Sequence, residues 1–174
     1  LFRWQRAFSR ADLPSGEGSL ALMLQGIEHF SAAGYKFLGL DHFAKPNDPL
    51  ARAHDRRELG RTFQGMTTGR GEATIGVGPS AISTHGDGFA QNARDVKTWT
   101  NRVEATGFAT ARGHRLTEDD RRRGDLLQAI YGCGEVDVKA WEGRHGLPFR
   151  RYFQDLLPTI DQMQTTGLLT WQGE

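Results

Sequence analysis

The sequence predicts an α/β fold followed by a small, mostly helical second unit. Patterns typical of helices and of short strands alternate over the first half of the chain, and such alternation favours parallel pairing of the strands. After about residue 108, three segments with helical spacing follow one another. At 174 residues, the chain can form one good core, or one core and a small second unit. We therefore divide it into an α/β part, residues 1–107, and a helical part, residues 108–174.

The α/β part is predicted to begin with an amphipathic helix at about residues 16–33, where five apolar side chains recur at three- and four-residue steps. Gly34 can end this helix, and the apolar segment 35–40 follows as a strand. A second helix is expected near residues 50–59 and a second, buried strand at residues 73–77. Two strands cannot make a whole sheet, so the remaining strands are expected upstream of the chain.

The later helices are predicted from capping and breaking residues. Asn92 can cap a helix that Gly107 ends. The segment 117–120 places three acids in the first turn of another helix, where they complement its dipole. A third helical pattern covers residues 149–163, and Pro158 is expected to divide it into two pieces.

Composition excludes several classes of protein. Lys and Arg number 22 against 21 Asp and Glu, and a net charge of +1 gives no electrostatic reason to bind nucleic acid or an anionic membrane. The longest purely apolar run, residues 20–24, is too short to cross a bilayer, and no signal segment stands at the start, so a cytoplasmic location is expected. One cysteine, Cys133, cannot alone hold an iron–sulfur cluster or a structural zinc. The opening at Leu1 without methionine, and a strand-like run at 168–171 with no returning strand, predict a fragment of a longer protein.

Residues 61–83 contain two uncharged glycine loops joined by the predicted strand 73–77. Glycine lets the backbone turn tightly or lie directly against a ligand, so the segment predicts a site built from backbone. Gly76-Val77-Gly78-Pro79-Ser80-Ala81 nominally matches a dinucleotide-binding fingerprint. We disfavour that interpretation, because the fingerprint needs a helix to open at its second glycine and Pro79 removes an amide donor there.

Single polar residues leave alternatives open. His42 follows the strand 35–40 beside Asp41, and it can serve either as an acid–base group or ligand or in a structural hydrogen bond. The triplet Arg121–Arg123 is preceded by three acids, which favours a solvated helical face over a nucleic-acid-binding one. Cys133 has no basic neighbour in the sequence and is expected to be a buried structural thiol.

Several motifs together resemble one family. They are Gly34-Tyr35-Lys36-Phe37-Leu38-Gly39-Leu40-Asp41-His42-Phe43-Ala44-Lys45-Pro46, Phe63-Gln64-Gly65, Thr67-Thr68, Gly76-Val77-Gly78, Ser80-Ala81-Ile82-Ser83 and Phe89-Ala90-Gln91-Asn92. In order and spacing they resemble the C-terminal part of the oxygen-independent coproporphyrinogen III oxidases, which are radical S-adenosylmethionine enzymes. The resemblance spans nearly the whole chain. It implies the last strands and helices of a partial (β/α) radical-SAM barrel over residues 1–107, and a truncated helical C-terminal domain over residues 108–174.

The resemblance also implies an activity. Enzymes of this family act in haem and porphyrin biosynthesis, where they oxidatively decarboxylate two propionates of coproporphyrinogen III to give protoporphyrinogen IX. S-adenosylmethionine supplies the radical, and a 4Fe-4S cluster reduces it. The family's cluster cysteines lie in a region outside this chain, so the chain alone is expected to be inactive. The resemblance implies a monomer when intact and leaves the electron donor open.

Three residues match cofactor positions of the family. Ile82 matches a position that lines S-adenosylmethionine, and Phe63 with Gln64 matches a pair close to the same cofactor. An apolar wall excludes water from a reactive radical, and a glutamine amide can bind polar cofactor atoms without adding charge. No catalytic residue and no metal ligand of this chain follows from the resemblance. Met66 departs from the pattern, because an aromatic residue, usually tyrosine, is expected there.

Two other functions compete with this interpretation. The related haem chaperones share the barrel but bind haem without decarboxylation, and the motifs Phe63-Gln64-Gly65 and Ser80-Ala81-Ile82-Ser83 favour the oxidase over them. A winged-helix nucleic-acid module would require a basic surface, which the near-neutral charge disfavours.

Overall fold

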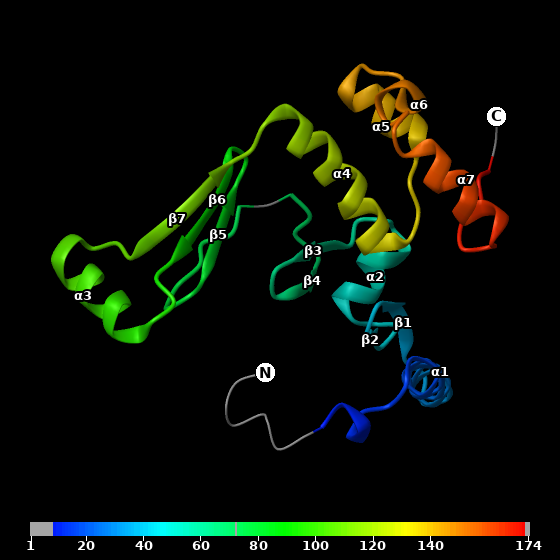
Figure 1. Cartoon of the computed structure of the whole chain (residues 1–174), viewed down its shortest axis with the longest axis horizontal. Coiled ribbons are helices and arrows are strands. Elements are labelled where there is room, and N and C mark those ends of the chain that lie inside the picture. Colours follow the sequence, from blue (N-terminus) through cyan, green and yellow to red (C-terminus); the bar gives the residue numbers. More distant parts are fainter. Residues whose placement is uncertain (1–8, 72, 173–174) are drawn as a thin grey trace. The chain divides into compact units, whose positions relative to one another are not determined.

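The computed structural model describes residues 9–71 and 73–172 (Figure 1). The described residues fall into two compact units. The first contains the residues up to 71 together with Tyr131–Gly134, and the second contains Ala73–Ile130 and the residues from 135 onwards. Each unit is described by itself.

The first unit consists of two helices and two hairpins. After a short 3-10 helix, η2 (Arg10–Asp12), come α1 (Gly16–Ala32), β1 (Lys36–Gly39), β2 (His42–Ala44), α2 (Pro49–Asp55), β3 (Gly60–Thr62) and β4 (Gly65–Thr67). Ser15 caps α1 by accepting a hydrogen bond from the Gly18 amide, and Asp48 caps α2 through the Leu50 amide. Polar side chains therefore fix where both helices begin.

A small core holds the first unit together. It consists of Leu38, Ala44, Ala51, Ala53 and Leu59, against which Leu50, Met66 and Cys133 pack. Alanines dominate because α2 lies close to the β1–β2 hairpin, and small side chains permit that approach. Cys133 is a free thiol that packs against this core, but it is half-buried rather than buried as predicted.

The predicted helix at residues 16–33 is confirmed as α1, but none of its side chains is buried. Leu20, Leu22 and Leu24 are each more than half exposed. Phe30, near the end of the helix, contacts the rings of Tyr35 and Phe43 at centroid distances of 5.7 and 4.7 Å. These ring contacts join the end of α1 to the hairpin that follows it.

The second unit begins with an antiparallel sheet. Its strands are β5 (Ile82–His85), β6 (Gly88–Asn92) and β7 (Thr110–Arg115), in the order β5-β6-β7, and α3 (Val96–Thr106) connects the last two (Figure 1). Gly88 begins β6 with its backbone against the His114 carbonyl, where a Cβ has no room. Glycine at this position therefore permits the close pairing of β6 with β7.

The rest of the second unit is helical. It contains α4 (Glu118–Cys133) up to Ile130, α5 (Val138–His145), α6 (Phe149–Tyr152) and α7 (Leu157–Thr165). Trp141, Phe149 and Phe153 form its buried core. The Trp141 ring centroid lies 5.3 Å from that of Phe149 and 5.1 Å from that of Phe153. Aromatic rings thus form the buried centre of this helical part, and partly buried aliphatic side chains pack against them.

Strand pairing differs from the prediction. All pairings of the described strands, β1 with β2, β3 with β4, and β5 with β6 and β7, are antiparallel. The expectation of parallel pairing was wrong. Short turns reverse the chain in the β1–β2, β3–β4 and β5–β6 hairpins, whereas parallel strands need a long crossover. β6 and β7 are also antiparallel, although α3 connects them. Helices and strands do alternate, so the α/β class is confirmed.

The prediction of a strand at residues 73–77 was also wrong. There, Thr74 forms an isolated bridge with Thr84, and Ile75 and Val77 are 85% and 87% exposed. The strand begins instead at Ile82, beyond the glycines. An apolar and β-branched segment was mistaken for a buried strand, because exposure depends on the rest of the fold.

Three further predictions need correction. Asp95, rather than Asn92, caps α3 by accepting from the Thr98 amide. The helix after Pro148 is divided, but Pro158 lies in the first turn of α7 instead of in the gap. Residues 168–171 form no strand, and the Trp171 ring contacts Phe149 at 6.3 Å. The partly buried Trp171 packs against the aromatic core of the helical part, and no strand pairing is involved.

Candidate functional site

Phe63 and Gln64 form the turn of the β3–β4 hairpin. Thr62 pairs with Gly65 across this turn, and the Gln64 amide donates to the Thr62 hydroxyl oxygen at 3.2 Å. Gly65 has a φ of +137°, which glycine adopts more readily than other residues. Both side chains of the turn are exposed, Phe63 by 65%. The motif therefore presents an aromatic ring and an amide together at the tip of a hairpin.

His42 lies against this turn. It begins β2, and its Nε2 atom is 3.1 Å from the point that a Cβ of residue 65 would occupy. Its Nδ1 atom is 2.8 Å from Asp41 Oδ1, an ion-pair distance, but makes no hydrogen bond of acceptable geometry among the described residues. The side chain is 30% exposed, whereas Asp41 is 88% exposed. His42 follows the turn of the β1–β2 hairpin and Gly65 follows the turn of the β3–β4 hairpin, and the two residues are in contact. The sequence analysis did not predict this contact.

Ile82 belongs to the second unit. It begins β5, is half-buried, and pairs with Gln91 on β6. A Cβ on Gly76 would lie 2.7–2.8 Å from backbone atoms of Ile82. Hence the close backbone approach predicted from the glycines exists at Gly76, and its partner there is the protein's own strand.

Polar side chains fix the glycine segment against the sheet. The Gly76 amide donates to Ser83 Oγ at 3.0 Å, and Asn92 Nδ2 donates to the Gly78 carbonyl at 3.0 Å. Asn92 thereby binds the glycine segment instead of capping a helix. Ser80, in the same segment, has a positive φ of 58°. The motif from Gly76 to Ile82 therefore has a structural reason, which is to keep this loop on β5.

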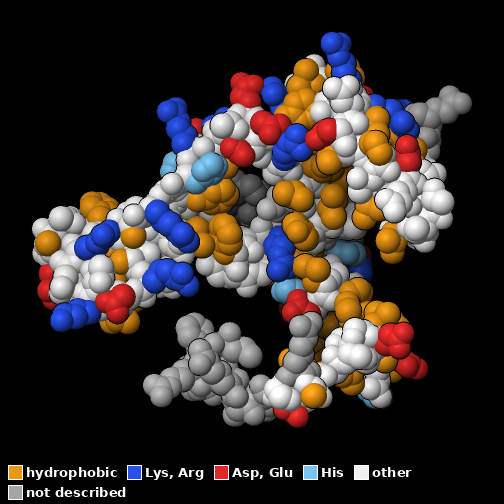
Figure 2. All heavy atoms as spheres, in the orientation of Figure 1, with side chains coloured by type: hydrophobic (Ala, Val, Ile, Leu, Met, Phe, Trp, Pro, Cys, Tyr) orange, Lys and Arg blue, Asp and Glu red, His pale blue; other side chains and the backbone are white. Residues whose placement is uncertain are grey.

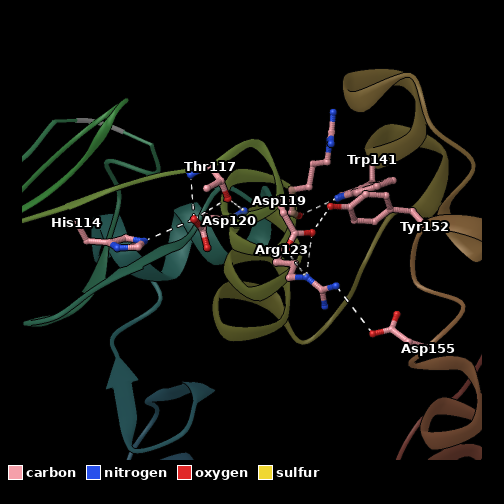
Figure 3. Close-up of polar contacts among 9 residues, drawn as sticks. His114, Thr117, Asp119, Asp120, Arg123, Trp141, Tyr152 and Asp155 are labelled. Carbon is pink, nitrogen blue, oxygen red and sulfur yellow. Dashed lines mark hydrogen bonds and ion pairs between the residues drawn. The ribbon is translucent and has the colours of Figure 1, made fainter.

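A cluster of polar side chains surrounds the beginning of α4 (Figure 3). Thr117 and Asp120 cap the helix reciprocally, because each backbone amide donates to the other side chain, at 2.9 and 3.1 Å. His114 Nε2 lies 3.5 Å from Asp120 Oδ2. The Thr117 amide and hydroxyl hydrogen bonds lower the pKa of Asp120 below its ordinary value.

Asp119 joins α4 to α6 in the same cluster. The Tyr152 hydroxyl donates to its carboxylate, and Arg123 Nε donates to it at 2.9 Å (Figure 3). The hydrogen bond from Tyr152, helped by Arg123, lowers the pKa of Asp119, and the same bond raises the pKa of Tyr152. The titratable side chains of this cluster therefore have structural partners: Asp120 caps the start of α4, and Asp119 binds Tyr152 of α6.

The arginine triplet has acidic partners within its own unit. Arg121 pairs with Asp87, Arg122 with Glu118 and Arg123 with Asp119. Acidic and basic side chains are also interspersed on the face of the molecule shown in Figure 2. This pairing agrees with the predicted solvated helical face.

The described residues also set limits on cofactor chemistry. Within residues 9–71 and 73–172, there is no group of three or more His, Cys, Asp or Glu side chains that could hold a metal ion. In the same ranges no helix is both long and apolar enough to span a membrane. The exposed Gln64 amide and Phe63 ring carry a polar and a planar group that an organic ligand could contact.

The chain is similar in sequence to several known proteins. No family model matches the chain. It is 40% identical over 169 residues to the oxygen-independent coproporphyrinogen III oxidase of Salmonella typhimurium, 37% over 169 residues to that of Escherichia coli K12, and 36% over 168 residues to that of Pseudomonas aeruginosa. Each match covers 97% of this chain but only 36–37% of the relative, so the chain spans about a third of their length.

A solved structure matches as well. The coproporphyrinogen III oxidase of Escherichia coli, described as a radical SAM enzyme, has a TM-score of 0.91 and 36% identity to this chain. The match covers 98% of the chain and 39% of the enzyme. The resemblance inferred from the motifs is therefore confirmed, as is the predicted fold class, although the described strands form no closed barrel.

Proposed function

We propose that this chain, similar over nearly all its length to about a third of the oxygen-independent coproporphyrinogen III oxidases, is part of an oxidoreductase of that kind. The observation that carries the proposal is the 36% identity with a TM-score of 0.91 over 98% of the chain. The intact protein would decarboxylate coproporphyrinogen III to protoporphyrinogen IX in haem biosynthesis.

The cofactors of the proposed enzyme divide between this chain and the rest of the protein. S-adenosylmethionine with a reduced 4Fe-4S cluster supplies the one-electron chemistry that begins the oxidation of a propionate. Such a cluster needs several thiolates, and this chain has one cysteine. We therefore place the cluster ligands outside this chain and assign Cys133, which packs on the small core of the first unit, a structural role.

The Phe63–Gln64 turn is proposed to border S-adenosylmethionine. The Gln64 side chain is exposed and carries both a donor and an acceptor, so it can pair with polar atoms of the cofactor without bringing charge. The exposed Phe63 ring offers an apolar surface beside it. The hairpin fixes the backbone of both residues, and this reduces the entropy lost when they bind a ligand.

Ile82, in the second unit, is proposed to line S-adenosylmethionine with an apolar side chain, as the family resemblance implies. Its strand is paired on one side with β6 and held on the other by the Gly76 segment. On that second side the strand is held by the Thr74–Thr84 bridge and by the Gly76 amide, which donates to Ser83 Oγ. An aliphatic residue there excludes water and other hydrogen donors without offering a polar group of its own.

The remaining features of the proposal concern the whole protein. Residues 1–107 would complete a radical-SAM barrel, and residues 108–174 would belong to a C-terminal helical domain. We propose a cytoplasmic enzyme that is monomeric when intact. Its net charge of +1 gives no electrostatic support for a nucleic acid or an anionic membrane as partner.

The experiment is anaerobic assay of the intact protein after cluster reconstitution. Coproporphyrinogen III, S-adenosylmethionine and a low-potential reductant are supplied, and protoporphyrinogen IX is measured by fluorescence after oxidation. Product formation that depends on S-adenosylmethionine is expected. The Cys133→Ser variant is the matched control and should keep its cluster iron and sulfide. Stoichiometric haem binding without any decarboxylation would contradict the proposal and favour a haem chaperone.

A further inference from the structure

We infer that His42 is a positioning residue for the Phe63–Gln64 turn, and that its ring sets where this turn meets S-adenosylmethionine. The inference rests on the proposed function of the turn. His42 is far from the turn in sequence, and the contact arises because the β1–β2 and β3–β4 hairpins meet near their tips.

The contact leaves no room between the two residues. Nε2 of His42 is 3.1 Å from the place of a Cβ on residue 65, a distance tighter than ordinary van der Waals contact. Gly65 also has its φ at +137°, where other residues are strained. The position thus combines two requirements for glycine, one from the backbone and one from the imidazole ring.

The imidazole is packed on more than one side. Asp41 Oδ1 lies 2.8 Å from Nδ1 without a hydrogen bond of acceptable geometry, and Nδ1 is buried although the side chain as a whole is 30% exposed. On the other side of the residue, β2 pairs with β1 through the neighbouring Phe43 and Phe37, whose ring centroids are 5.2 Å apart. A ring fixed in this way can act as a stop for the adjacent hairpin.

The consequence concerns Phe63 and Gln64. Both residues directly precede Gly65 in the sequence. A shift of Gly65 therefore moves both side chains. Small displacements of a positioning group cost up to about 10²-fold in rate. Loss of the ring should therefore weaken S-adenosylmethionine binding and turnover while the hairpin itself remains formed.

The first test compares ring removal with ring replacement in the intact enzyme. His42→Ala removes the stop, His42→Phe keeps a planar ring without nitrogen, and His29→Ala changes an exposed histidine of α1 as a control. Hydrogen exchange of the segment 62–67 is measured without cofactor. Exchange about tenfold faster in His42→Ala, with the other two variants close to wild type, is expected. Unchanged exchange in His42→Ala would overturn the inference.

The second test uses Gly65→Ala in both backgrounds. The strain of a positive φ is common to both, whereas the clash with the ring exists only when His42 is present. Gly65→Ala should therefore accelerate exchange more in wild type than in His42→Ala, and equal effects in the two backgrounds would overturn the contact as a positioning device. If His42→Ala folds poorly, His42→Asn, which also lacks the ring but keeps a polar side chain, provides the second background.

Cofactor affinity separates this inference from the proposed function. S-adenosylmethionine binding should be about tenfold weaker in His42→Ala, and His42→Phe should restore it. If Gln64→Ala weakens binding but His42→Ala does not, the positioning role is overturned while the proposed function stands. If neither variant weakens binding, the proposed cofactor role of the turn fails, and with it the role of His42 toward the cofactor.

Discussion

Gly132, in the last turn of α4, lies with its backbone against the carbonyl oxygen of Leu59, a residue with no exposed surface. A Cβ at position 132 would overlap that oxygen, although residue 132 still belongs to the helix, where alanine has the higher propensity. The contact therefore requires glycine for steric reasons, at a place where helix propensity alone would disfavour it.

Gly132→Ala should accordingly destabilise the protein by about 1–3 kcal/mol, because the added methyl forces the helix and Leu59 apart. Gly124→Ala is the matched control in the same helix, where a Cβ meets no atom within 4 Å. It should be neutral or stabilising by up to about 1 kcal/mol. Thermal unfolding of both variants measures the difference, and equal stabilities would contradict the steric role of Gly132.

Gln64→Ala should weaken S-adenosylmethionine binding by about 1 kcal/mol, because an amide hydrogen bond to the cofactor is lost. Cluster iron and sulfide should stay at the wild-type level, since the residue does not ligate iron. Binding is measured by titration of the reconstituted enzyme. Gln25→Ala, on the exposed face of α1, is the control and should bind normally.

Ile82→Asp should reduce turnover more strongly than Gln64→Ala, because an unpaired charge in an apolar, water-excluding site costs about 2 kcal/mol or more. Ile75→Asp introduces the same charge at a side chain that is 85% exposed and should have little effect. The two variants are compared in protoporphyrinogen formation at equal cluster content. Wild-type turnover in Ile82→Asp would remove this residue from the site.

Tyr152→Phe should change how stability depends on pH. The lowered pKa of Asp119 stabilises the fold above its unfolded value near 3.8, and this contribution is lost as the pH falls through the folded pKa. The raised pKa of Tyr152 stabilises below its unfolded value near 10.0, and this is lost as the pH rises through the folded pKa. The variant should therefore be least stable, relative to wild type, between these limits.

The melting temperatures of Tyr152→Phe and wild type are compared from about pH 3 to about pH 11. This range spans the ordinary pKa values of both groups. Tyr35→Phe removes a hydroxyl from the other unit and serves as the control. A difference between Tyr152→Phe and wild type that is constant across the whole range would contradict the Asp119 hydrogen bond.

Phe153→Ala should destabilise by about 3–5 kcal/mol, because it removes a ring with no exposed surface from the aromatic core of the helical part. Phe108→Ala removes the same number of atoms from a side chain that is 77% exposed and should cost far less. Chemical unfolding of both variants gives the comparison. Similar free energies of unfolding would show that the aromatic cluster is not a core.

The sequence predicted the elements that depend on neighbours along the chain. The periodicity of α1, the acidic first turn of α4 and the end of α3 at Gly107 were all confirmed, because caps and helical faces follow from residues within one or two turns. The motif Phe63-Gln64-Gly65 likewise indicated a glycine loop and, together with the other motifs, the family. Local chemistry was sufficient for these features.

Tertiary structure alone decided which segments pair and which residues from distant positions meet. The sequence contains nothing that leaves Ile75 exposed or that places Asn92 on the Gly78 carbonyl. Nor does it bring His42 to Gly65. Such contacts depend on how hairpins and loops fill shared space, and a pattern read along one segment does not contain the shape of its partner.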